Sequence, residues 1–323
     1  MTEDAYVRRF GFRRYEGIRS NRISRIISVS WFNLGEAIRR SGFTKMLLVF
    51  MIIGLLVQDL LAILITSLVP SSMWGDITVN EMFRATYADS IIGMISLTNR
   101  VSTMDSDMAF LTQFLTIGSS FMFILLLAVV SGGLISDDRL FQATEAYYSR
   151  ISRFEYVLGK LFTLIIFSMV FVSLPAVMQY FLLAQGLEVN MIANLDLLLW
   201  GLGTTLLSSV VLSIVTLAFS SLTKRRNLAT LSFFMAAMIM SALPAAFGLV
   251  FATEPTTLII DFVGCIGLLA AMFLGRSSVT VNGQTVRFYN GLGLEGYMVV
   301  ATVALLVFLG VLALVLTLFR RDS

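Results

Sequence analysis

Residues Phe110–Ile135 read FLTQFLTIGSSFMFILLLAVVSGGLI, a stretch that contains no charged side chain. A helix needs about 20 predominantly apolar residues to cross the hydrocarbon core of a bilayer, so this stretch predicts a transmembrane helix. Five further stretches predict spans for the same reason: Lys45–Val69, Val157–Leu183, Leu195–Phe219, Leu228–Phe251 and Tyr297–Phe319. The expected fold class is therefore an all-α polytopic membrane protein with six transmembrane helices.

The composition agrees with a membrane protein and excludes several kinds of catalytic site. Of the 323 residues, 57% are hydrophobic and 13% are charged, whereas soluble domains carry about 25% charged residues. The chain has no histidine, which excludes Ser-His-Asp triads and HExxH zinc sites. Its single cysteine, Cys265, excludes an internal disulfide. We expect no enzyme activity, no cofactor and no metal in this chain.

The distribution of basic residues predicts the orientation. Lys and Arg concentrate in cytoplasmic segments. Residues Leu258–Gly275 are apolar but short, and could be a seventh span or a re-entrant or interfacial arm. With six spans, 19 basic residues lie on the N-terminal side and four lie on the opposite side, while a seventh span would put Arg320 and Arg321 outside. We therefore predict six spans with both termini cytoplasmic, and a non-spanning 258–275.

Two regions follow from this layout: a cytoplasmic N-terminal segment, 1–44, and a transmembrane domain, 45–323. Residues 22–44 place apolar side chains at helical spacing among arginines, which predicts a basic amphipathic helix on the membrane surface. The alternative is that this helix packs on another subunit. Its candidate functional residues are Trp31, Glu36, Arg39 and Arg40.

The outer loops, 70–109 and 252–296, carry signals of their own. Thr78 and Glu81 form a capping-box pattern, which predicts a short outer helix from about Val79 to Leu97. In the second loop, residues 278–281 and 284–288 alternate apolar and polar side chains around Asn282-Gly283. That pattern predicts a small extracellular β-hairpin.

A single acidic side chain, Asp59, lies inside the first predicted span, next to Gln58. A charged group in hydrocarbon is costly, and this makes Asp59 a functional candidate on a substrate or ion path. The alternative is that Asp59 and Gln58 form hydrogen bonds to a neighbouring helix, or that they lie close to the outer water.

Nucleotide-binding motifs fail in their context. Gly159-Lys160 is followed by Leu161 where a P-loop needs Ser or Thr. Gly291, Gly293 and Gly296 match GxGxxG, but a membrane span follows them instead of a βαβ unit. The chain is therefore not expected to hydrolyse a nucleotide by itself, and no nucleic-acid partner is expected.

The cytoplasmic loop 136–156 is the most informative segment. It carries charges of both signs and two tyrosines, Tyr147 and Tyr148, and tyrosine and arginine are enriched where proteins dock. The alternative is a solvated loop that interfacial aromatic side chains anchor.

A pattern of short motifs runs through and just past this loop: Asp137-Asp138-Arg139, Ala143-Thr144-Glu145, Ile151-Ser152-Arg153, Glu155 and Gly159-Lys160. The pattern resembles the coupling segment of type-2 ABC exporter permeases, the transmembrane subunits of ATP-binding cassette transporters. The chain departs from the family pattern at Ala143, where glycine is usual, and at Arg150, where proline often stands. About 25 residues carry the motif, and the rest of the likeness is general layout.

The resemblance implies a permease that pairs with a second copy or a paralogue, in a homo- or heterodimer, and binds separate ABC ATPase subunits that hold ATP and Mg. It implies export across a plasma membrane, of a prokaryotic kind, and the apolar spans favour a lipid-like or amphipathic cargo. An ATPase-independent carrier or channel and a permease-like structural subunit remain alternatives. The residues expected to dock the ATPase are Asp138, Arg139, Thr144, Glu145, Tyr147, Tyr148, Arg153 and Glu155.

Overall fold

The computed structural model describes residues 21–40, 42–68, 78–95, 108–141, 151–250, 260–274, 278–281, 284–287 and 294–319. Within these residues, six helices are long and apolar enough to cross a membrane, which confirms the predicted number. They are α3 (Gly42–Leu68), α5 (Met108–Gly132), α8 (Arg153–Gly186), α9 (Leu195–Leu222), α10 (Arg226–Val250) and α12 (Leu294–Phe319).

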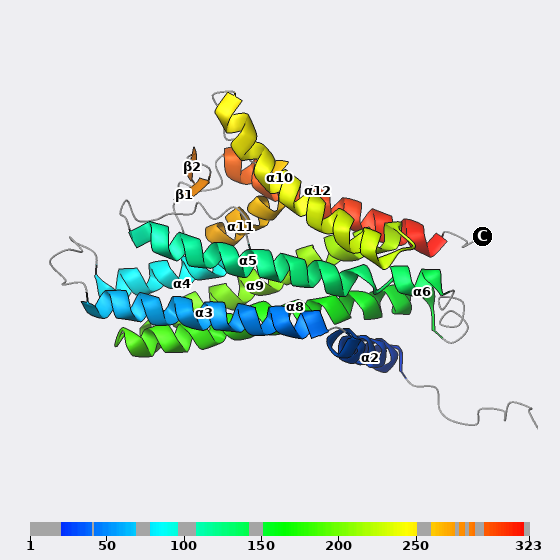
Figure 1. The fold of residues 1–323 in the computed structure, drawn as a ribbon, viewed down its shortest axis with the longest axis horizontal. Helices are drawn as coiled ribbons and strands as arrows, with labels where there is room; N and C mark the ends of the chain where they lie inside the picture. The colour runs from blue at the N-terminus through cyan, green and yellow to red at the C-terminus, as the bar shows by residue number, and fades with distance from the viewer. Residues whose placement is uncertain are drawn as a thin grey trace, which may run out of the picture.

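Helices α3, α5, α8 and α9 run side by side along the long axis of the molecule, while α10 and α12 diverge from them (Figure 1). Helix α9 lies inside the bundle, because 67% of the residues in its apolar stretch are buried, whereas the figure for α12 is 22%. Its buried face carries small hydroxyl residues, among them Ser208, Ser209 and Ser213. Small side chains let helix backbones approach closely in membranes.

The predicted outer helix is present as α4 (Val79–Ile95), and its capping box is confirmed. The Glu81 amide donates to Thr78 Oγ1 over 3.2 Å, and the Thr78 amide donates to Glu81 Oε2 over 2.9 Å. Helix α4 is not a surface helix, however. Phe83 and Tyr87 are fully buried, and both rings lie 5.5 Å from that of Tyr180 on α8. The segment therefore belongs to the packed bundle.

The stretch predicted not to span forms α11 (Phe262–Phe273), a 12-residue helix. At 1.5 Å per residue it is about 18 Å long, too short for a core of about 30 Å. Asp261 begins the helix: its Oδ1 accepts from the Gly264 amide and from Ser241 Oγ, each over 2.8 Å. Cys265 is buried within α11, as expected for a packing residue.

Two short strands follow, β1 (Ser278–Val281) and β2 (Gln284–Arg287), which pair antiparallel with Val279 opposite Val286. The predicted turn, Asn282-Gly283, and the predicted last strand residue, Phe288, lie outside the described residues.

Helix α2 (Arg22–Arg40) and the one-turn helix α6 (Ser136–Leu140) lie together at one end of the bundle. Helix α2 lies across the direction of the spans (Figure 1). The predicted limits of two elements need correction. The amphipathic helix ends at Arg40, not at residue 44, and α5 ends at Gly132, not at Ile135. The pair Gly132-Gly133 weakens helix continuation and accounts for the end of α5, and residues 42–44 belong to α3.

Candidate functional site

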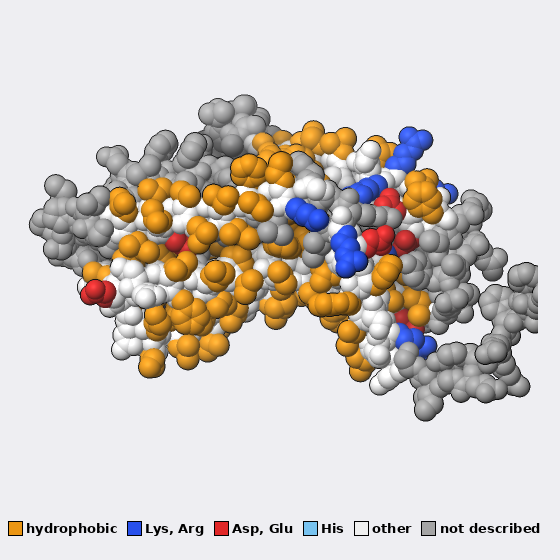
Figure 2. Space-filling view, turned by 60° about the horizontal axis from the view of Figure 1, so that its bottom comes forward, with side chains coloured by type: hydrophobic (Ala, Val, Ile, Leu, Met, Phe, Trp, Pro, Cys, Tyr) orange, Lys and Arg blue, Asp and Glu red, His pale blue; other side chains and the backbone are white. Residues whose placement is uncertain are grey.

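Charged side chains gather toward the α2 end of the face seen in Figure 2, and hydrophobic side chains cover most of the rest. Residues 136–156, whose sequence resembles a coupling segment, start at this end, directly after α5. We call them the family-like segment. The candidate site is formed by the residues that join α2, α5, α6, α8 and α9.

The break between α5 and α6 is held by serines. The Ser136 hydroxyl donates to the Gly132 carbonyl, and Ser220 Oγ of α9 donates to the same oxygen over 3.2 Å. Ser220 Oγ also accepts from the Ile135 amide over 3.2 Å. A helix end leaves backbone groups without intrahelical partners, and Ser220 satisfies them here. The turn that positions Asp138 and Arg139 is thus fixed to α9.

Asp138 faces into the protein. Its Oδ2 lies 2.7 Å from Lys160 Nζ and accepts from the Tyr156 hydroxyl over 2.6 Å. Lys160 is 2% exposed and also donates to Asn33 Oδ1 of α2 over 2.7 Å. One ammonium group therefore joins α2, α6 and α8. We call Asn33, Asp138, Tyr156 and Lys160 the lysine clamp.

Arg139 extends the connection to the end of α9. Its guanidinium donates to the Ser221 carbonyl, and the residue is 8% exposed. Cations at a helix C-terminus interact favourably with the unpaired carbonyls there. The side chain fixes α6 to α9 inside this chain, although sequence reasoning assigned it to docking.

Glu155 is likewise engaged within the chain. Together with Ser152 it forms a capping box at the start of α8, with hydrogen bonds of 3.1 and 3.2 Å. Its Oε1 lies 2.9 Å from Arg25 Nη2 and 4.0 Å from Arg22 Nε. Glu155 is 5% exposed. This carboxylate therefore caps the start of α8 and also pairs with arginines of α2.

Helix α2 crosses α8 at very short range. A Cβ at Gly159 would lie 2.7 Å from Val29 Cγ1, so only glycine fits there. Ser30 Oγ donates to the Gly159 carbonyl over 2.9 Å. Sequence reasoning missed Ser30, Asn33 and Ser152. The pattern Ser152-x-x-Glu155 could have revealed the last of these, since it is a capping-box signature.

Large apolar side chains are exposed on both sides of residues 142–150. Phe141 is 73% exposed and Phe154 is 63% exposed, and Arg153 is exposed beside Phe154. These residues flank the part of the segment that includes Thr144, Glu145, Tyr147 and Tyr148, all outside the described residues. We call Leu140, Phe141, Arg153 and Phe154 the exposed tip.

The candidate residues of α2 divide between its two faces. Trp31 is 72% exposed and Arg39 is exposed, whereas Glu36 interacts electrostatically with Lys160. The side chain of Arg40 lies outside the described part of the chain. The helix thus offers an aromatic and basic face while its other face packs on α8.

Asp59 belongs to a separate polar chain. Gln179 Nε2 of α8 donates to Asp59 Oδ1 over 2.6 Å, and Gln179 Oε1 accepts from Ser90 Oγ of α4 over 2.7 Å. All three residues are at most 4% exposed. The contact favours the hydrogen-bonding interpretation of Asp59, and the side chain of Gln58 lies outside the described part.

Farther along α4, away from α2, Arg84 Nη2 lies 2.8 Å from Asp196 Oδ2 at the start of α9. Arg84 Nη1 also donates to Asn194 Oδ1 over 3.0 Å.

In the described part of the chain, no group of three His, Cys, Asp or Glu side chains is placed to hold a metal ion.

Comparison of the chain with known protein families, with characterised proteins and with solved structures finds no match.

Proposed function

We propose that this chain is the transmembrane permease subunit of an ABC transporter of the exporter type, driven by ATP that a separate, Mg-dependent ATPase subunit hydrolyses. The observation that carries the proposal is the lysine clamp, because it anchors both flanks of the family-like segment. Asp138 on one flank and Tyr156 on the other share a hydrogen bond of 2.6 Å. Lys160 joins them to α2.

Such an anchored segment can transmit force. A partner can shift a two-state equilibrium only by contacting the two states differently. The described ends of the segment are fixed to α2, α8 and α9 through Lys160, Glu155 and Arg139, so displacement of these ends acts on those helices. An ATPase that changes shape beneath the segment therefore acts on the helices themselves.

The exposed tip supplies the docking surface in this proposal, together with Thr144, Glu145, Tyr147 and Tyr148. Aromatic side chains and arginine dominate the energetics of protein interfaces. Phe141, Phe154 and Arg153 provide both kinds of side chain. The half-buried Asp138 and the buried Arg139 and Glu155 act as positioning residues, because their polar atoms bind within the chain.

The membrane placement is part of the proposal. The 19 basic residues on the α2 side support cytoplasmic termini. With Trp31 exposed on a basic helix that lies across the spans, α2 is an elbow helix in the membrane surface. Helix α4, helix α11 and the β-hairpin then lie on the outer side of a prokaryotic plasma membrane, and a second permease copy or a paralogue completes the path.

The test is purification of the tagged chain from its native membrane in mild detergent, with identification of what co-purifies. We expect a stoichiometric ABC ATPase. The variant Arg153→Glu is expected to lose at least tenfold of the bound ATPase, because it reverses an exposed charge in the docking surface. Lys224→Glu reverses an exposed charge on a different loop and is the matched control.

Two further variants test the rest of the docking surface. Glu145→Lys and the pair Tyr147→Ala with Tyr148→Ala are expected to weaken ATPase association while the protein remains folded by circular dichroism. Intact association in all three variants would refute the docking assignment. A preparation without an ATPase, even after cross-linking, would refute the permease proposal and favour an independent carrier or channel.

A further inference from the structure

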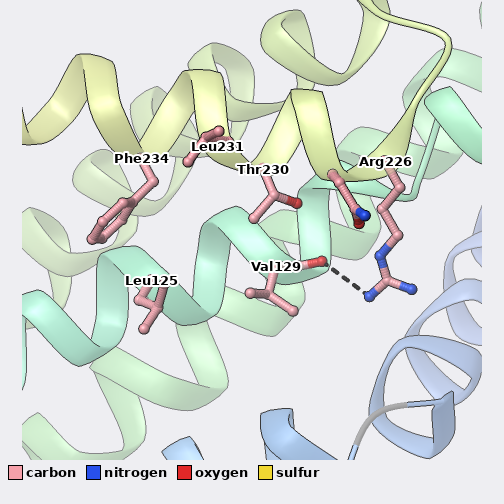
Figure 3. A pocket seen from close by; sticks show the side chains of 7 residues that line it. Leu125, Val129, Arg226, Thr230, Leu231 and Phe234 are labelled. Carbon is pink, nitrogen blue, oxygen red and sulfur yellow. Dashed lines mark hydrogen bonds between the residues drawn. The ribbon is translucent and has the colours of Figure 1, made fainter.

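A groove of about 490 Å³ opens between α5 and α10, near the end of the bundle where α2 lies. Figure 3 shows the side chains that line it. Its walls are apolar, with polar groups at one end. The lining residues are Leu125, Val129, Arg226, Asn227, Thr230, Leu231 and Phe234.

The groove exists because the two helices touch closely at one level and separate beyond it. A Cβ at Gly132 would lie 2.1 Å from Thr230 Oγ1, so the helices are in contact there. Thr230 Oγ1 also donates to the Ala128 carbonyl over 3.3 Å. Farther along, α10 leaves the bundle (Figure 1). Phe234 meets Phe121 edge to face at 5.5 Å and bounds the apolar end.

The polar end carries positive charge with few partners. Arg226 is the first residue of α10, and in the described part of the chain its guanidinium makes one hydrogen bond, a long contact of 3.4 Å from Nη2 to the Val129 carbonyl. Asn227 is exposed beside it, and Lys224 and Arg225 precede it, both exposed. The first amides of a helix add to the attraction for an anion.

Asp137 lies close to this end. A Cβ at Gly133 would lie 2.9 Å from Asp137 Oδ2 and 3.4 Å from Arg226 Nε. Residues 224–226 are all basic and outnumber this carboxylate. The polar end of the groove therefore carries a net positive charge.

We propose that this groove binds an anionic phospholipid of the leaflet on the α2 side. Its phosphate lies against Arg226 and Asn227, and an acyl chain lies along Leu125, Val129, Leu231 and Phe234. Sites of roughly 300–1,000 Å³ that pair apolar walls with a few polar groups are typical of ligand pockets. Basic side chains beside a span attract anionic lipids. The lipid is a resident of the groove, and the inference does not depend on the transport proposal.

The test places a fluorescent reporter at the apolar end. The variant Phe234→Trp is reconstituted into vesicles of phosphatidylcholine that contain a small fraction of brominated phosphatidylglycerol or brominated phosphatidylcholine. Quenching is corrected for the parent protein, which has the same three native tryptophans. We expect about fivefold stronger association of phosphatidylglycerol, the factor that one basic residue near the surface contributes.

The controls separate the groove from general surface charge. In the Phe234→Trp background, Arg226→Ala is expected to abolish the preference, and Arg225→Ala, which removes an equal charge outside the groove, is expected to keep most of it. In Phe234→Trp without a second substitution, high salt should reduce the preference for phosphatidylglycerol, because the screening length falls to about 3 Å at 1 M.

Three outcomes would overturn the proposal. The first is equal quenching by the two brominated lipids. The second is a preference that Arg226→Ala leaves unchanged. The third is weak quenching by both lipids together with efficient disulfide cross-linking of a Phe234→Cys variant into dimers, because a second copy of the chain then covers the groove.

Discussion

Removing the charge of Lys160 tests whether the lysine clamp holds α2, α6 and α8 together. In Lys160→Met, the apolar stem stays, but Asp138 loses a 2.7 Å ion pair and Asn33 loses a 2.7 Å hydrogen bond. Breaking a buried ion pair by removing one partner costs about 3–5 kcal/mol. Asp138 keeps its bond to Tyr156 and its side chain is 17% exposed, so we expect the lower end, about 3 kcal/mol.

The assay is unfolding of the purified protein in mixed micelles with increasing dodecyl sulfate, followed by circular dichroism. The double variant Lys160→Met with Asp138→Asn leaves no unpaired buried charge, so its loss should be smaller than the sum of the two single losses by at least about 1 kcal/mol. Lys224→Met makes the same chemical change at an exposed position and should stay within about 0.5 kcal/mol of the parent.

Two results would refute this reasoning. If Lys160→Met unfolds at the same detergent fraction as Lys224→Met, the clamp contributes nothing to stability. If the double variant loses the sum of the two single losses, Lys160 and Asp138 are not coupled, and the segment is held by other contacts.

Three other predictions address packing, the membrane-embedded polar chain and a helix cap. Gly132→Ala should destabilise by about 1–3 kcal/mol in the same assay, because its Cβ would overlap Thr230, whereas Gly203→Ala should be near neutral since nothing lies within 4 Å of its added Cβ. Gln179→Leu removes the buried donor to Asp59 and should cost about 1 kcal/mol. Disulfide cross-linking between cysteines introduced into α3 and α8 should become faster. Hydrogen bonds from Thr78 hold the pKa of Glu81 below its ordinary 4.5. The cap is therefore fully stabilising above pH 4.5, and its contribution is lost as the pH falls through the pKa of the folded state. Hydrogen exchange in the first turn of α4 should accelerate in acid, and Glu81→Gln should remove that acid dependence.

The elements were predictable wherever one local signal decided them. Long uncharged runs defined the spans, and the Thr78–Glu81 pattern defined the start of α4. The burial of α4 was not predictable. Its sequence mixes Arg84 and Asp89 with apolar residues, and only its partners show that Phe83 and Tyr87 face inward. Burial depends on which helices surround a segment, and a local pattern does not contain that information.

The same limit applies to the candidate site. Sequence reasoning selected Asp138, Arg139 and Glu155, but it could not tell an internal partner from an external one. Arg25 pairs with Glu155 across 130 positions, and Arg139 reaches the Ser221 carbonyl across 82. Contacts at such separations come from the tertiary arrangement alone. The Ser152–Glu155 capping box, in contrast, was visible in the sequence.

The internal contacts of these residues determine where a force applied to the exposed tip would act. Because Arg139 is bonded to α9 and Ser220 bonds the Gly132 carbonyl, displacement of the exposed tip is passed to α9 and to the end of α5 together. Gly132 is also the point where α5 touches Thr230 of α10. These contacts link the exposed tip to the α5–α10 contact that bounds the groove. If they transmit displacement, Lys160→Met, which loosens the anchoring of the tip, should alter the lipid preference as well as the stability.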